Sequence, residues 1–154
     1  MPPVNPIPSD YPTVTPYLIV DGAAKAIDFY KQVFGATERG RLAGPDGKVG
    51  HAELQIGTSV IMLADECPEM GASGPKTIGD TPVKMHIYVE DSDAIVAKAV
   101  AAGATIVRPL EDKFYGDRAG MIADPFGHMW HIASRKEILT SEEIGRRASE
   151  LFSK

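Results

Sequence analysis

The chain of 154 residues has little of several features that define protein classes. It contains a single cysteine, Cys67, so no disulfide can form within one chain, and a reducing compartment is favoured. No apolar run approaches the roughly 18 residues that cross a bilayer, and the proline-rich start lacks the basic and apolar regions of a secretory signal. We therefore expect a cytoplasmic protein with no membrane partner.

Clustered basic charge is also missing. The formal net charge is −5 and the pI is near 5.3, whereas phosphate contacts need grouped Lys and Arg side chains, so we expect no nucleic-acid partner. No GxSxG, P-loop or GxGxxG motif occurs. What remains is an ordinary globular composition, 44% hydrophobic and 24% charged. The chain is long enough for a hydrophobic core that needs no disulfide or structural metal to fold.

The first half of the chain predicts one strand, one helix and three strands. Residues 1–12 are rich in proline, which fixes φ and removes backbone donors, so they predict an extended arm. Residues 13–20 are β-branched and aromatic, and residues 23–35 repeat apolar side chains at helical spacing before stopping at Gly35. Turn residues then separate three runs with strand-like composition, at 36–43, 48–57 and 59–65. We predict a βαβββ module over residues 13–64.

The second half repeats this order after an exposed Gly- and Pro-rich linker at 65–82. A strand at 83–90 and a helix at 92–103 precede strands at 104–112, 116–124 and 128–134. Gly35-Ala36-Thr37 recurs as Gly103-Ala104-Thr105, each time after a helix. The fold class we predict is α+β, with a second βαβββ module over 83–134 and curved mixed sheets around a shared cup.

Residues 135–154 predict an added helix. Thr140 or Ser141 can cap its start, and Ile144, Ala148 and Leu151 form a narrow apolar stripe at helical spacing. A stripe of this width is typical of a helix that docks on its own chain or on a partner subunit.

Three stretches, TPYLIVDGAAKAIDFYKQVFGA, HAELQIGTSVIMLAD and FYGDRAGMIADPFGHMWHIA, resemble the vicinal oxygen chelate superfamily of glyoxalases, extradiol dioxygenases and bleomycin-resistance proteins. More narrowly they are similar to its PhnB-like branch. The resemblance covers residues 13–134, and Asp124-Pro125-Phe126-Gly127-His128 is its most specific part. It implies paired sheets curved into a cup, a divalent metal that acts there as a Lewis acid, and a homodimer formed by packing or exchanging halves.

The resemblance places the family's metal ligands at Thr15, Met62, Lys84 and His131. Only His131 is an ordinary ligand, because Met62 offers a soft thioether and a protonated Lys84 has no lone pair. Thr15 adds a weak neutral oxygen. We therefore predict no cofactor at the usual position, so a divalent metal, if present, is displaced.

Strand alternation predicts which polar side chains face the cup. His51, Glu53 and Gln55 alternate with apolar residues, Lys84, His86 and Tyr88 share one face, and Met129, His131 and Ala133 share another. Two interpretations of His51, Glu53, His86 and His131 stay open: a displaced site for Fe, Zn or Mn, or metal-free polar groups of a pocket.

Lys84 fits an anionic carboxylate or phosphonate, or is a surface lysine. The segment 114–118 is either a loop whose Tyr115 and Arg118 gate or stack on a ligand, or a simple turn.

We predict a small-molecule-binding protein of the glyoxalase/bleomycin-resistance type with a small organic ligand and no usual metal. The predicted pocket residues are Thr15, His51, Glu53, Met62, Lys84, His86, Tyr115, Arg118 and His131. The alternative is a lyase, isomerase or dioxygenase that uses the displaced His/Glu site or acid-base chemistry, with catalytic residues unassigned. The fold does not name the ligand.

Overall fold

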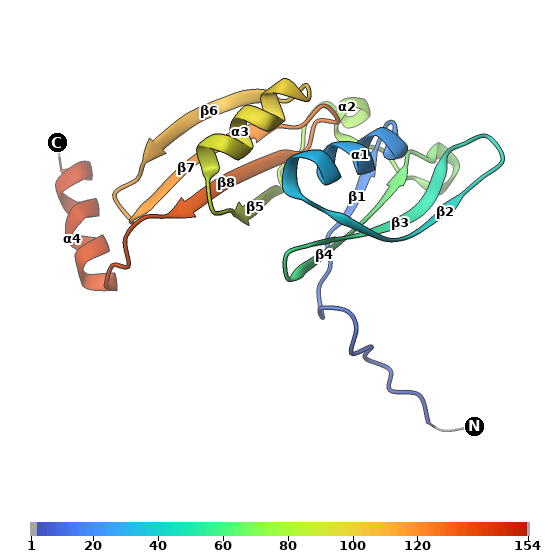
Figure 1. Cartoon of the computed structure of the whole chain (residues 1–154), viewed down its shortest axis with the longest axis horizontal. Coiled ribbons are helices and arrows are strands. Elements are labelled where there is room, and N and C mark those ends of the chain that lie inside the picture. The colour runs from blue at the N-terminus through green and yellow to red at the C-terminus, as the bar shows by residue number, and fades with distance from the viewer. Residues whose placement is uncertain (1–2, 154) are drawn as a thin grey trace. The chain divides into compact units, whose positions relative to one another are not determined.

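The computed structural model describes residues 3–153, which form two compact units that divide between Gly79 and Asp80. The first unit carries a four-stranded sheet of order β1-β4-β3-β2 with one long helix (Figure 1). Strand β1 runs parallel to β4, and the other pairs are antiparallel. The elements are β1 (Tyr17–Val20), α1 (Ala23–Phe34), β2 (Thr37–Ala43), β3 (Val49–Ile56), β4 (Ser59–Asp65), the 3₁₀ helix η1 (Pro68–Met70) and α2 (Pro75–Ile78).

The second unit repeats the arrangement with sheet order β5-β8-β7-β6, and helix α3 packs on strands β6, β7 and β8 (Figure 1). Its elements are β5 (Lys84–Tyr88), α3 (Ser92–Ala101), β6 (Thr105–Asp112), β7 (Asp117–Ala123), β8 (Met129–Arg135) and α4 (Ser141–Phe152). The predicted α+β class, the two βαβββ modules and the C-terminal helix are confirmed. The cup shared by both modules stays a prediction.

Each core lies between one sheet face and its helix. Helix α1 buries Ile27 and Tyr30 completely, and strands β3 and β4 bury Leu54 and Leu63 to the same degree. In the second unit, Trp130 and Ile132 of β8 are buried together with Val96 and Ala99 of α3. Within residues 3–153, no helix of the same unit covers the opposite face of either sheet, where His51, Glu53, Lys84 and His86 are half-buried or exposed.

Two predicted boundaries were wrong. Strand β1 begins at Tyr17 rather than at residue 13, because Pro16 has no N–H for a ladder and contributes only its carbonyl, which accepts from the Met62 N–H at 2.9 Å. Residues 65–82 hold two short helices, and the Glu66 carboxylate accepts from the Gly74 N–H at 3.0 Å. The segment also contacts β1, because the Glu66 N–H donates to the Val20 carbonyl at 3.0 Å and a Cβ at Gly74 would lie 2.9 Å from the Ile19 carbonyl oxygen.

Strand β6 departs from a regular ladder. Its register against β7 shifts on both sides of Arg108, first after Ile106 and again before Glu111. Gly120 of β7 lies behind this irregularity, because a Cβ there would meet the Arg108 carbonyl oxygen at 2.8 Å and the Leu110 nitrogen at 3.0 Å. The absence of a side chain at Gly120 permits the bulged course of β6.

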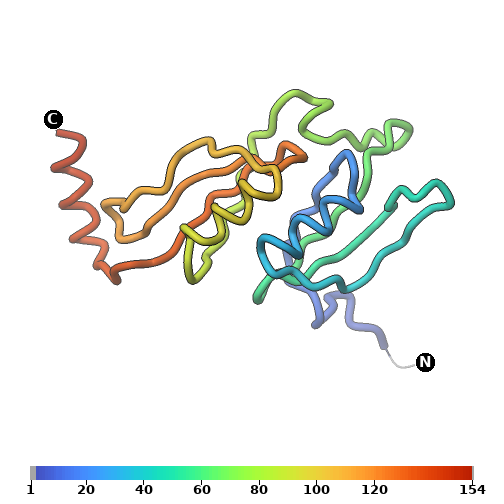
Figure 2. Tube along the Cα trace, turned by 45° about the horizontal axis from the view of Figure 1, so that its top comes forward, coloured from blue at the N-terminus to red at the C-terminus, as the bar shows by residue number. Residues whose placement is uncertain are grey.

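Helix α4 follows β8 and lies at the end of the second sheet that carries the β6–β7 turn (Figure 2). Thr140 is its N-cap, and its hydroxyl accepts from the Glu143 N–H at 3.1 Å. The helix docks on the β6–β7 turn, since Arg147 donates to the Phe114 carbonyl at 3.2 Å and the Phe114 and Phe152 rings lie 6.0 Å apart. Within residues 3–153, none of the helices combines the length and the apolar character that a membrane span requires.

Candidate functional site

The open face of the first sheet, away from α1, carries a row of predicted pocket residues. Tyr17, Met62 and Glu53 are register neighbours across β1, β4 and β3. His51 lies on the same face two residues before Glu53, so the sidedness predicted for this strand agrees with the register. Thr15 is half-buried but precedes the ladder.

Hydrogen bonds join four side chains of this face into one chain. Tyr17 Oη lies 2.8 Å from His51 Nδ1, His51 Nε2 lies 2.8 Å from Glu53 Oε2, and the Tyr11 hydroxyl donates to Glu53 Oε1 at 2.6 Å. The Glu53 carboxylate is held ionised, because the hydrogen bonds from His51 and then Tyr11 lower its pKa. An ionised carboxylate only accepts, so Nε2 of His51 donates to Glu53, while Nδ1 bonds to the Tyr17 hydroxyl.

Sequence reasoning missed both tyrosines of this chain. Tyr17 had a usable signal, since it stands at an alternating position of its strand. Tyr11 had none, because it lies in the proline-rich arm and reaches Glu53 only through tertiary structure. The Arg39 guanidinium lies 4.5 Å from the centre of the Tyr11 ring, which fixes this part of the arm on the first sheet.

The open face of the second sheet brings two predicted histidines together. His86 of β5 is the direct register partner of His131 of β8, and their ring centres lie 4.8 Å apart at an interplanar angle of 35°. His131 also pairs with Met121, which in turn pairs with Arg108, so these four residues form one row across the sheet. Tyr88 stands beside His86 and donates to Asp117 at 2.9 Å.

His131 is the most constrained group of this row. Its Nδ1 atom is buried and has no hydrogen-bond partner within residues 3–153. Burial lowers the pKa of His131, and the nearby charges of His86, Lys113 and Arg108 lower it further. The ring is therefore kept neutral, with one buried nitrogen that can serve a bound molecule.

Lys84 extends this face at the start of β5. It pairs in register with Met129, one row away from His131, and it is exposed. In the part of the chain that the structure describes it forms no ion pair, so its charge is available to a ligand.

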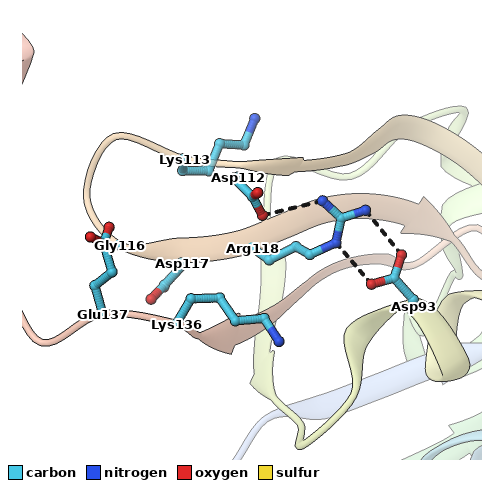
Figure 3. Close-up of a pocket in the computed structure, with 8 residues that line it drawn as sticks. All are labelled: Asp93, Asp112, Lys113, Gly116, Asp117, Arg118, Lys136 and Glu137. Atoms are coloured by element: carbon cyan, nitrogen blue, oxygen red, sulfur yellow. Dashed lines mark hydrogen bonds and ion pairs between the residues drawn. The ribbon is translucent and has the colours of Figure 1, made fainter.

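Arg118 does not join these residues. A tight turn at 113–117, in which Lys113 N donates to Asp117 O at 2.7 Å, makes the loop shorter than predicted and places Arg118 inside β7. Arg118 pairs with Ser134, on the α3 side of the sheet. It lines a hollow of about 480 Å³ there, where it donates to Asp93 at 2.8 and 3.0 Å and to Asp112 at 3.2 Å (Figure 3). Its charge is already satisfied by these two carboxylates.

Tyr115 lies in the same turn. Its ring contacts Phe114 edge-on, with ring centres 5.2 Å apart, and burial raises the pKa of its hydroxyl. Since Phe114 also touches Phe152 of α4, the aromatic pair serves helix docking. A role for Tyr115 toward a ligand stays a prediction.

The donor set at the family's metal positions does not fit a divalent ion. Thr15 and Met62 lie in the first unit and offer a hydroxyl and a thioether, while Lys84 and His131 lie in the second and offer one good ligand between them. Within residues 3–153 there is no group of three or more His, Cys, Asp or Glu side chains placed to hold a metal. For the displaced set, each unit supplies two residues, His51 with Glu53 and His86 with His131.

Comparison with known proteins now places the chain. Residues 12–132 match the Glyoxalase/Bleomycin resistance protein/Dioxygenase superfamily. The chain belongs to this superfamily. The resemblance inferred from the sequence is thereby confirmed.

Relatives within the superfamily extend over most of the chain. An uncharacterized protein of Mycobacterium tuberculosis is 48% identical over 136 residues, which cover 86% of this chain and 80% of that protein. The solved structure of a gene product from Arabidopsis thaliana is 32% identical with a TM-score of 0.66, and the match covers 80% of this chain and 98% of that one. A solved PhnB protein from Bacillus cereus, 18% identical over 80% of this chain and 99% of that one, has a TM-score of 0.65 and shows the shared fold alone.

Proposed function

We propose that this protein binds a small organic ligand on the open faces of its sheets without a resident divalent metal. The observation that carries the proposal is the buried Nδ1 atom of His131, which has no partner within residues 3–153. A buried polar atom left unsatisfied costs roughly 1–3 kcal/mol, and a ligand polar group that reaches it would recover this free energy. His86 stacks beside it, so the site is already ordered.

The residues at the metal positions support the metal-free form of the proposal. A hydroxyl, a thioether and an ammonium replace ligands that a divalent ion needs, so binding must come from hydrogen bonds, charge and apolar contact. Bleomycin-resistance proteins are among the members that the superfamily's description names, and binding of an organic compound is the function we carry over from them.

Thermal-shift measurements with a panel of small aromatic and heterocyclic compounds test this proposal. We expect at least one compound to raise the melting temperature equally with and without EDTA, and to lose this effect in His131→Ala. His128→Ala, in the turn before β8, is the matched control. Stoichiometric Fe, Zn, Mn or Ni in protein purified without chelator, lost in His131→Ala, would overturn the metal-free form.

A second candidate function is metal-independent acid-base chemistry, favoured by the Tyr17–His51–Glu53 hydrogen-bond chain. A carboxylate that orients a neutral imidazole toward a hydroxyl is an arrangement able to accept and return a proton. Turnover of a bound compound that is lost in His51→Gln, while the compound still binds, would favour this candidate over simple binding.

We also propose a homodimer. Several large apolar side chains are exposed in the single chain, among them Val83 at 64%, Ile138 at 89% and Phe152 at 74%. Sedimentation velocity at micromolar concentration should give the mass of two chains. A monomer at these concentrations would contradict the proposal.

A further inference from the structure

We infer that the open face of the β5–β8–β7–β6 sheet binds the acidic group of an organic anion, and that a flat aromatic carboxylate is the class that fits it best. This inference rests on the proposed function and names its ligand class. It follows from the placement of charge on this face and from the apolar surface between the charges.

The cations of this face are grouped by the register of the sheet. Arg108, His131 and His86 stand in one row, with only Met121 between them. Lys84 lies one row away at the start of β5, and Arg135 closes the other end, 6.0 Å from the centre of the Tyr88 ring. A chain with a formal charge of −5 thus gathers positive charge on one sheet face.

Two of these cations lack the carboxylate partners that several other cations within residues 3–153 have. Within residues 3–153, Lys84 and Arg108 form no ion pair, whereas Arg118 has two carboxylate partners. Unpaired guanidinium and ammonium groups beside one another are the usual recognition elements for carboxylates.

Two acids of the same face have hydrogen-bond or ion-pair partners, and a third, Glu90, lines a hollow with Tyr88 and Arg135 at the end of the sheet away from Lys84. Asp117 is 5% exposed and accepts the Tyr88 hydroxyl at 2.9 Å. Glu111, opposite Ala119, pairs with Lys113 at 3.2 Å. Neither carboxylate faces Lys84 or Arg108 as an ion-pair partner, so the positive potential of the row is left for a bound anion.

The surface between the cations is apolar and small. Strands β8 and β7 present Met129, Met121 and Ala123 as half-buried side chains, while Ala119 and Ala133 of the same face are covered by their neighbours. Methionine adapts its shape and packs well on aromatic rings, and alanine keeps the floor low. Strands β6 and β8 are two spacings apart, roughly 10 Å, so a ring fits between Arg108 and His131 with its acidic group toward either.

His131 belongs to the row of cationic side chains and also to the strand that carries Met129 and Ala133. Its buried Nδ1 lacks a partner within residues 3–153. The groups that face His131 are His86 from β5, Arg108 from β6, Lys113 from the turn after β6, and Asp117 from β7.

The test uses sodium 1-naphthoate as the probe and neutral 1-naphthamide as its matched compound, with binding measured by calorimetry and by ¹H–¹⁵N spectra of the full chain. We expect naphthoate to bind at least tenfold more tightly than naphthamide and to shift the amide signals of β5 and β8. Lys84→Met and Arg108→Met should each weaken naphthoate binding by about fivefold to tenfold, as expected for losing a charge-assisted contact. Lys98→Met, an exposed lysine on α3, should leave it unchanged.

The outcomes separate this inference from the proposed function. If naphthoate and naphthamide bind equally and His131→Ala abolishes both, the anion inference is overturned while ligand binding stands. If Lys98→Met weakens naphthoate binding as much as Arg108→Met does, the binding reflects the general surface charge of the protein, and the inference is overturned. If neither probe binds, the inference fails, and the proposed function is then judged by the compound panel alone.

Discussion

Asp124 is the residue whose removal should damage the second unit most. It is 4% exposed, and its Oδ1 accepts from the Phe126 and His128 N–H groups, both at 2.9 Å, while its Oδ2 accepts the Trp130 indole N–H at 2.9 Å. These three bonds shape the turn that leads into β8 and fix Trp130 beside His131. The aspartate of the family-like stretch at 124–128 is therefore a structural anchor.

Asp124→Ala removes one charged acceptor from three donors, two of them in buried hydrogen bonds. At roughly 1–3 kcal/mol for each buried donor that loses its acceptor, we expect the free energy of unfolding to fall by about 3–5 kcal/mol. Trp130→Phe removes one of the three donors. The lost hydrogen bond should lower the free energy of unfolding by about 1–2 kcal/mol, in addition to the loss from poorer packing. Asp46 is the control, since it is an exposed aspartate of the β2–β3 turn whose carboxylate accepts from the Lys48 N–H at 3.1 Å.

Urea denaturation followed by tryptophan fluorescence measures the effect, because Trp130 is the only tryptophan of the chain and is 2% exposed. Circular dichroism serves as the second probe for Trp130→Phe. Asp46→Ala should change stability by less than about 0.5 kcal/mol. A loss below about 1 kcal/mol in Asp124→Ala, or one equal to that of Asp46→Ala, would refute the anchoring role.

Three further predictions concern the site and its surroundings. Because burial lowers the pKa of His131, the unfolded chain binds more protons, so the free energy of unfolding should fall as the pH drops below the unfolded value of about 6.5 and level off below the folded pKa. Urea titrations between pH 7.5 and 5 should show this slope, and His131→Leu should reduce it. Arg147→Met removes hydrogen bonds to Phe114 and Glu137, so hydrogen exchange in α4 should become faster while exchange in β7 and β8 is unchanged. Gly120→Ala places a Cβ against the Arg108 carbonyl at 2.8 Å and should cost about 1–3 kcal/mol, whereas Gly145→Ala, with open space around it, should be neutral or stabilising in thermal unfolding.

Much of the fold could be predicted because local periodicity encodes it. The alternation of HAELQI placed His51 and Glu53 on the face away from α1, and Gly35 marked the end of that helix, where it adopts φ +68°. The repeat of element order then gave the second module without any knowledge of contacts.

The site was harder to predict because it depends on register between distant strands. The pairing of His86 with His131 is set by the parallel ladder of β5 and β8, and no local pattern determines that alignment. Arg118 is a different case. The segment 114–118 was predicted to be a loop over the cup or a simple turn, whereas β7 begins at Asp117, so Arg118 shares the α3 face of the strand with Gly120 and Ile122. The Tyr11 contact to Glu53 depends entirely on where the arm folds back.

Gly120 connects the course of β6 with the anion site that we propose. It supports the irregular course of β6 from the α3 side, and that course decides where the Arg108 guanidinium lies on the opposite side. If Arg108 binds an anion as proposed, ligand preference in this unit depends partly on a residue behind the sheet. A side chain at Gly120 would then reposition the Arg108 guanidinium while leaving its chemistry unchanged.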